Sequence, residues 1–370
     1  AIRSGFTRYT NVEGINELRD AIIAKFRRDN GLEYQRSQIL ASNGAKHTIF
    51  NLCCALLDPG DEVIIPAPYW VSYPDMVLIA DGEPVPVFAG ANQGYKITPA
   101  QLAAAITPRT RLLILNSPCN PTGAAYSRAE LVAFGSVLAK HPDIVIATDD
   151  MYEHIWWGPE PFCSFATACP DLYDRTVTIN GVSKSYAMTG WRLGYCGGPA
   201  ELIAAMATIQ SQSTSNASSI SQKAATVALN GPQECVAEMN RAFKARHDFI
   251  VAGLNDLPGT SCLAGWGTFY AFANVEPAMR MTGSADDNAF AGLDFRDDGR
   301  LAERARAHAK SVRRGPQNGD GRGRAGNILH HMPLHHAGIL VIAATGGGTD
   351  DDAELLAAIE ILCRRCPDAN

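Results

Sequence analysis

The chain lacks several features that would place it in particular protein classes. No apolar run approaches the roughly 20 residues that a membrane-spanning helix needs. Charged residues make up only 19% of its 370 residues, and the net charge of -6 gives no basic surface for nucleic acid. We therefore expect neither a membrane partner nor a nucleic-acid partner.

The ten cysteines do not follow the spacing of a disulfide framework. They are spread through apolar segments, as at Cys53, Cys54, Cys119 and Cys196. This distribution favours reduced thiols in a cytoplasmic protein. Cys363 and Cys366 form one C-x-x-C motif with no second pair, so we expect no bound metal.

The hydrophobic fraction of 46% is large enough for a sizeable core, and the length favours two domains. Apolar, β-branched runs predict strands at residues 62–65, 84–88, 111–115, 144–148 and 176–180. Helical periodicity appears at residues 14–30, 44–57, 127–140, 200–211 and 217–229, and a longer helix is predicted to run from about 232 toward 257. This alternation predicts an α/β fold with helices on both faces of a sheet.

The most informative stretch begins at Ser183 and Lys184 and continues to Arg192. Lys184 follows a predicted buried strand, and a partly desolvated lysine can lose its proton near neutral pH and attack a carbonyl. Arg192 carries a planar guanidinium suited to a phosphate dianion. An aldehyde that carries a phosphate describes pyridoxal 5'-phosphate. Taken alone, a lysine and an arginine in one turn are more often a solvated surface pair.

Polar residues follow two other predicted strands. Asn120 lies in a Pro/Gly-punctuated loop after the strand at 111–115, and the carboxyl ends of strands are where open α/β sheets bind ligands. Asp149 and Tyr152 follow the strand at 144–148, where a carboxylate can pair with a protonated ring nitrogen and a phenol can reach a ring hydroxyl. Asn120 could instead cap a turn, and Asp149 with Asp150 could be two turn carboxylates.

Two further segments are compatible with the same ligand. Gly44, Ala45 and Lys46 open a predicted helix, whose free backbone amides can bind phosphate. Trp70 follows a predicted strand and could stack on a heteroaromatic ring, although a single tryptophan is more often ordinary core.

From Arg8 to about Phe272 the chain resembles a class I aminotransferase of pyridoxal-phosphate fold type I, in the bacterial aspartate aminotransferase branch. The resemblance implies a mostly parallel seven-stranded sheet flanked by helices, followed by a smaller α+β C-terminal domain. We expect a large cofactor-binding domain at residues 1–231, and a linking helix with a small domain at 232–370.

The resemblance also implies roles for single residues. Lys184, after Ser183, resembles the lysine of the internal aldimine, and Asp149 resembles the partner of the pyridine nitrogen. Tyr152 and Asn120 resemble the donors to the ring oxygen, and Trp70 resembles the ring-stacking residue. The implied phosphate site comprises Arg192, Gly44 and Ala45. Tyr9 resembles a residue that reaches the neighbouring subunit's site in a homodimer, although alone it could be a surface residue. Lys46 resembles the residue that binds the side-chain carboxylate of a dicarboxylic substrate. The resemblance also places Trp70 and Asn120 near the substrate.

The chain departs from the family pattern in two places. Residues 1–5 correspond to the inside of an expected helix, so the family's N-terminal arm is missing from this sequence. Residues 292–348 are rich in Arg, Gly and His, and the strands of the family cannot be recognised in their sequence. We expect this stretch to be aberrant or poorly ordered. A shifted reading frame is our hypothesis for it. The pattern returns at 349–362, which predicts a final helix.

The sequence therefore predicts transamination between an amino acid and 2-oxoglutarate, and we expect the amino acid to be aspartate. Prephenate or aromatic keto acids are the alternative substrates. A different hypothesis is a truncated or frame-disrupted remnant that binds the cofactor and is catalytically impaired.

Overall fold

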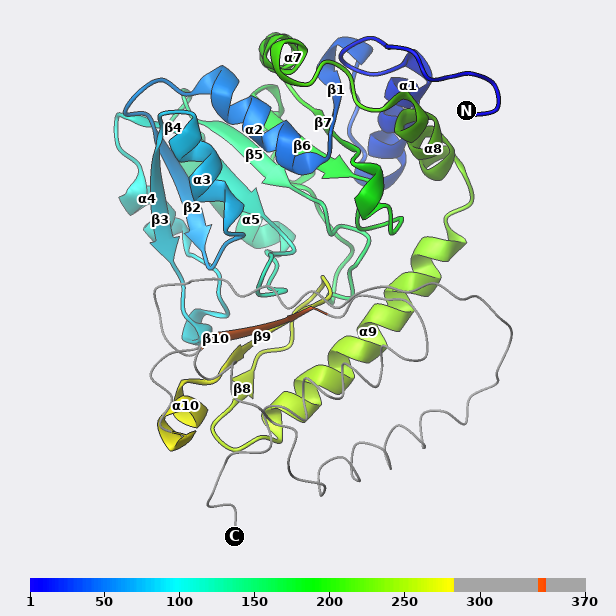
Figure 1. Ribbon diagram of the computed structural model, residues 1–370. Helices are drawn as coiled ribbons and strands as arrows, with labels where there is room; N and C mark the ends of the chain where they lie inside the picture. The colour runs from blue at the N-terminus through cyan, green and yellow to red at the C-terminus, as the bar shows by residue number, and fades with distance from the viewer. Residues whose placement is uncertain (283–338, 344–370) are drawn as a thin grey trace, which may run out of the picture. The chain divides into compact units, whose positions relative to one another are not determined.

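The computed structural model describes residues 1–282 and 339–343, and contacts divide the chain into two compact units (Figure 1). The large unit comprises Ala1–Asn120, Ala124–Asn240 and Trp266–Thr268. The small unit comprises Pro121–Gly123, Arg241–Gly265 and the chain from Phe269 onward. The boundary between the cofactor-binding domain and the small domain, expected at residue 231, stays a prediction.

A seven-stranded sheet forms the centre of the large unit, with strand order β1-β7-β6-β5-β4-β2-β3. The five strands β2 to β6 run parallel to one another, whereas β7 is antiparallel to both β6 and β1. The bounds are β1 Ile39–Ser42, β2 Glu62–Ala67, β3 Glu83–Phe88, β4 Thr110–Asn116, β5 Val145–Asp149, β6 Thr176–Gly181 and β7 Gly194–Gly197. The predicted mostly parallel, seven-stranded α/β sheet is confirmed.

Helices cover both faces of this sheet (Figure 1). The bounds are α1 Asn16–Lys25, α2 Ala45–Leu56, α3 Ser72–Ile79, α4 Pro99–Ala105, α5 Arg128–Leu138, α6 Phe165–Ala168, α7 Ala200–Ser213 and α8 Ser219–Asn230. Successive strand residues alternate between the faces: Val63 and Ile65 pack with α2, α3 and α7, while Ile64 packs with α4, α5 and α6. Helices α1 and α8 contribute to a third apolar cluster with β1 and β7.

Two sequence-based expectations for the large unit need correction. Residues 1–5 are not helical; they form a turn in which the Gly5 and Phe6 N–H groups donate to the carbonyls of Ile2 and Ala1. The sequence reasoning also missed β1, β7, α3 and α4. Strands β1 and β7 are only four residues long, and β7 contains two glycines, so their pattern is too short to stand out.

The small unit has a three-stranded antiparallel sheet of order β10-β9-β8. Its elements are α9 Glu234–Asn255, β8 Ser261–Cys262, β9 Tyr270–Asn274, α10 Glu276–Thr282 and β10 Ile339–Ala343. Strand β10 falls in the stretch where no strand was expected, and that expectation is wrong for these five residues. The rest of residues 292–348 and the final helix expected at 349–362 lie outside the described residues.

Within the described ranges, no helix combines the length and the hydropathy required to cross a bilayer.

Candidate functional site

The ends of three neighbouring parallel strands position the candidate site. Register pairs Asn116 with Asp149 across β4 and β5, and Asp149 with Ile179 across β5 and β6. Because these strands are parallel, their carboxyl ends meet at one edge of the sheet. Lys184 follows β6 by three residues, so the chain brings its amine toward the Asp149 carboxylate.

Asp149 is buried and Lys184 is half-buried, and desolvation shifts their pKa values in opposite directions. Desolvation lowers the pKa of Lys184, with the positive charge of Arg192 lowering it further and Asp149 opposing the shift. Desolvation raises the pKa of Asp149, while a hydrogen bond from Tyr73 and the charge of Lys184 oppose it. The Lys184 amine therefore loses its proton more readily than a free lysine. At Asp149, the hydrogen bond and the positive charge offset part of the desolvation that disfavours the carboxylate anion.

Three contacts hold the Asp149 turn. The Tyr73 hydroxyl donates to Asp149 Oδ2 at 2.6 Å, and the Met151 N–H donates to Oδ1 at 3.3 Å. Asn116 Nδ2 donates to the Asp149 carbonyl at 2.8 Å, while its Oδ1 accepts from the Asn120 N–H at 2.7 Å. Sequence reasoning missed Tyr73 and Asn116. A polar residue ending an otherwise apolar strand was the signal available for Asn116, and Tyr73 gave none.

The pairing of β1 with β7 builds a second part of the site. Ser42 is paired with Gly194, so the residues after β1 lie beside those before β7. Arg192 Nη1 donates to the Thr189 carbonyl at 2.9 Å. Its guanidinium lies so close to Gly44 that a Cβ there would be 3.0 Å from Arg192 Cζ. Gly44 has φ of 90° and precedes α2, so a glycine suits both the backbone and the space.

Trp70 and Lys46 also come together. Lys46 Nζ lies 4.7 Å from the centre of the Trp70 ring, and the Trp70 ring meets the Tyr73 ring edge-to-face at 5.4 Å. Tyr152 is buried, and Lys184 Nζ lies 5.8 Å from its ring centre. Of the other predicted residues, Ser183 is buried and Asn120 is half-buried. Tyr9 is 91% exposed and is not brought to these residues.

Buried polar contacts surround Glu153, which lies in the turn that follows β5. Lys25 and Glu153 form a buried ion pair, and Glu153 also accepts from Asn30 and Asn180, each at 2.8 Å. His154 contacts Ser185 Oγ at 3.0 Å, next to Lys184.

The group Asp29, Glu153 and His154 has the composition of a metal site. However, the Lys25 ammonium already pairs with Glu153 and lies 3.9 Å from Asp29. We therefore interpret this group as structural.

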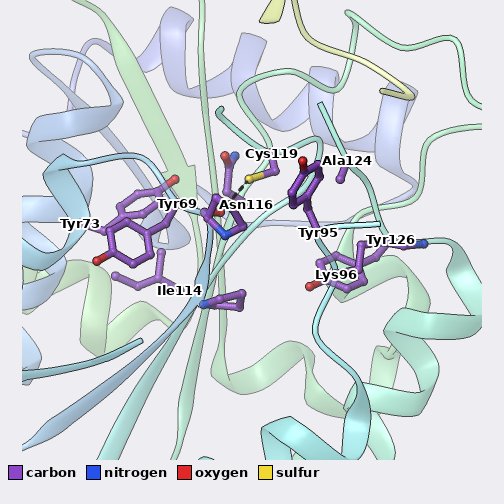
Figure 2. Close-up of a pocket in the computed structure, with 11 residues that line it drawn as sticks. Tyr69, Tyr73, Tyr95, Lys96, Ile114, Asn116, Cys119, Ala124 and Tyr126 are labelled. Carbon is purple, nitrogen blue, oxygen red and sulfur yellow. Dashed lines mark hydrogen bonds between the residues drawn. The ribbon is translucent and has the colours of Figure 1, made fainter. Parts of the chain in front are cut away.

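A small pocket opens beside the same strand ends (Figure 2). Its lining residues are Pro66, Pro68, Tyr69, Tyr73, Tyr95, Lys96, Ile114, Asn116, Cys119, Ala124 and Tyr126. Tyr73 and Asn116 belong both to this wall and to the contacts around Asp149. The pocket therefore adjoins the Asp149 site through shared side chains.

The donor set fits a phosphorylated pyridine aldehyde. Arg192 and the first amides of α2 offer a cation and N–H donors to a phosphate. A buried carboxylate suits a protonated ring nitrogen, and a lysine whose pKa is lowered suits an aldehyde carbon.

Comparison with known proteins identifies the family. The model of aminotransferase class I and II matches residues 1–309. The chain belongs to this family. It is accordingly a pyridoxal-phosphate-dependent aminotransferase.

Relatives and solved structures agree with this assignment. An aspartate/prephenate aminotransferase of Nitrosomonas europaea is 58% identical over 75% of this chain and 70% of its own. An aspartate aminotransferase of Rhizobium meliloti is 52% identical over 74% of this chain and 67% of its own. The crystal structure of an aspartate aminotransferase from Rhizobium meliloti matches with a TM-score of 0.81 and 42% identity, covering 99% of this chain and 86% of that one.

Proposed function

We propose that this aminotransferase moves an amino group between aspartate and 2-oxoglutarate, with prephenate or aromatic keto acids as the alternative acceptors. The observation that carries the proposal is Lys46, whose ammonium lies 4.7 Å from the Trp70 ring and offers a cation to a second carboxylate. Two relatives named for aspartate or for aspartate and prephenate support the same substrates.

The roles we propose for the site residues come from the family resemblance, and the contacts around Asp149 and Lys184 support them. When bound, pyridoxal phosphate supplies a ring that accepts the electron pair released at the substrate Cα. The Lys184 amine takes the Cα proton and later returns one, which its lowered pKa favours. Asp149 would hold the proton at the ring nitrogen, and Tyr152 and Asn120 would donate hydrogen bonds to the ring oxygen.

The remaining site residues bind and orient. Arg192, Gly44 and Ala45 would hold the phosphate, and Ser183, which directly precedes Lys184, would also contact the cofactor. Trp70 stacks on the ring.

We also propose a homodimer in which Tyr9 reaches the neighbouring subunit's site. The 91% exposure of Tyr9 supports this, because a side chain that exposed is available to a second copy. A cytoplasmic location is supported by the eight free cysteines among the described residues.

The test of function is the visible absorption of the purified protein with pyridoxal phosphate. Aspartate should change the band as the cofactor takes up the amino group, and 2-oxoglutarate should reverse the change. A band that neither substrate alters would favour the alternative, a chain that only binds the cofactor.

Substrate choice is tested by Lys46→Ala. Removing the cation should weaken aspartate relative to phenylalanine by up to about 1 kcal/mol, because Lys46 is exposed and solvent screens its pairing with a carboxylate. Lys223→Ala is the control, because Lys223 Nζ also lies over an aromatic ring, 4.8 Å from that of Phe6. Steady-state kcat/KM values for both amino acids decide the matter. Equal losses for the two would remove the argument from Lys46.

A further inference from the structure

Tyr73 makes the shorter of the two hydrogen bonds to the Asp149 carboxylate. It lies in α3 and is 1% exposed, and its hydroxyl is 2.6 Å from Asp149 Oδ2. The Met151 N–H is 3.3 Å from Oδ1. A distance of 2.6 Å between a hydroxyl and a carboxylate is typical of charge-assisted hydrogen bonds, which are about twice as strong as neutral ones.

Tyr73 also contacts the second residue that faces the cofactor position. Its ring meets the Trp70 ring edge-to-face, with centres 5.4 Å apart and planes at 89°. This geometry is favourable for two aromatic rings. One buried side chain therefore touches both the carboxylate and the indole, through its hydroxyl and its ring edge respectively.

We propose that Tyr73 is a positioning residue that orients the Asp149 carboxylate for the cofactor's ring nitrogen and fixes Trp70 beside it. The inference rests on the proposed role of Asp149. Each carboxylate oxygen has two lone pairs, so Oδ2 can accept from Tyr73 and still face the ring nitrogen. Tyr73 thus acts through Asp149 and does not touch the reacting atoms.

The other titratable groups around this pair come from three loops. Lys184 acts on Asp149 from the loop after β6. Cys119, after β4, and Tyr152, after β5, act on Tyr73. Because any of these could respond to a substitution, the test compares two ligands that differ only at the ring nitrogen.

The test measures cofactor affinity in the full-length, cofactor-free protein. The ligands are pyridoxal phosphate and an analogue in which C–H replaces the ring nitrogen. Tyr73→Phe keeps the ring against Trp70 and removes the hydroxyl. It should weaken pyridoxal phosphate roughly tenfold, as for one hydrogen bond to a charged group, and leave the affinity of the analogue unchanged. Titration calorimetry gives both constants without requiring turnover.

Tyr126→Phe is the matched control. Tyr126 is also buried and lines the same pocket, but its hydroxyl accepts from the Ile97 N–H at 3.0 Å. This variant should change neither constant. In an Asp149→Asn background Tyr73→Phe should have no further effect on pyridoxal phosphate, because the carboxylate it acts through is gone.

The outcomes separate the two hypotheses. If Asp149→Asn reduces the preference for pyridoxal phosphate over the analogue and Tyr73→Phe does not, the inference about Tyr73 is overturned and the proposed function stands. Equal losses for the two ligands in Tyr73→Phe would also overturn it, since they would indicate a structural role only. If Asp149→Asn leaves the preference unchanged, the proposed role of Asp149 fails and the inference fails with it.

Discussion

At the scale of single residues, Asp150 contrasts with Asp149. The two are adjacent and both buried, but the charge of Lys184 acts on Asp149. Asp150 Oδ1 instead accepts a hydrogen bond from the Thr148 hydroxyl at 2.6 Å. Burial raises the pKa of Asp150 to about 7. Asp150 therefore retains its proton in the folded protein at a pH where the unfolded chain has lost it.

This difference predicts a pH-dependent stability. Between about pH 4 and 7 the folded state binds more protons at Asp150 than the unfolded state, so stability falls as pH rises through this window. Asp150→Asn should reduce the loss between pH 5 and pH 8 by about 1–3 kcal/mol. Urea unfolding at both pH values measures it, with exposed Asp171→Asn as control. An unchanged difference between the two pH values would contradict the shift.

How far the sequence predicted single residues depends on where their partners lie. Lys184, Asp149 and Asn120 were predicted because each follows an apolar strand, and strand ends are a local signal. Tyr73 lies 76 positions from its partner Asp149, so no local pattern could indicate the contact. The contact of Tyr73 with Asp149 is evident only from the folded structure.

At the scale of elements, a buried ion pair connects α1 to the turn after β5. Lys25, the last residue of α1, is fully buried and pairs with Glu153 while donating to Asn30 Oδ1 at 2.8 Å. Glu153 lies four residues beyond Asp149. Burial raises the pKa of Glu153, but the Lys25 charge and other partners outweigh this and lower it overall. The pair thus fixes the turn that carries Asp149 and Tyr152.

Breaking this pair should be costly. Lys25→Met leaves the Glu153 carboxylate buried without its cation, which should reduce the free energy of unfolding by about 3–5 kcal/mol. Adding Glu153→Gln removes the uncompensated charge and should recover much of that loss. Urea unfolding of the single and double variants gives the coupling energy. Additive losses would show that the two side chains do not act as a pair.

Element prediction succeeded where apolar runs were long. Strand β4, with five buried residues from Leu112 to Asn116, was predicted nearly to its ends. Strands β1 and β7 were missed, although their pairing brings Arg192 beside Gly44. Gly194 can be only glycine there, because a Cβ would lie 2.7 Å from Ala45 Cα. The sequence indicated Arg192 and the helix start at Gly44 as separate phosphate-binding features, and the pairing of β1 with β7 explains why they lie together.

At the scale of the whole molecule, the resemblance implies a feature that the sequence does not supply. Members of the family are expected to hold the substrate α-carboxylate with an arginine on a strand of the small domain, shortly before the final helix. The corresponding segment, residues 338–345, reads GILVIAAT and contains no arginine. Strand β10 lies within it and pairs with β9, so the strand is formed without the side chain.

The missing guanidinium predicts a slow enzyme. A bidentate contact to the α-carboxylate both binds the amino acid and aligns its Cα with Lys184, so its loss should cost about 3–5 kcal/mol in kcat/KM. We expect the chain to bind pyridoxal phosphate and to show kcat/KM for aspartate below about 10⁴ M⁻¹s⁻¹, the lower end of the ordinary enzyme range. Steady-state kinetics on the holoenzyme checks this. A higher value would mean that another arginine performs the role, and the candidates are Arg313, Arg314, Arg322 and Arg324. Substituting each by lysine would then identify it, because lysine keeps the charge and loses the bidentate geometry.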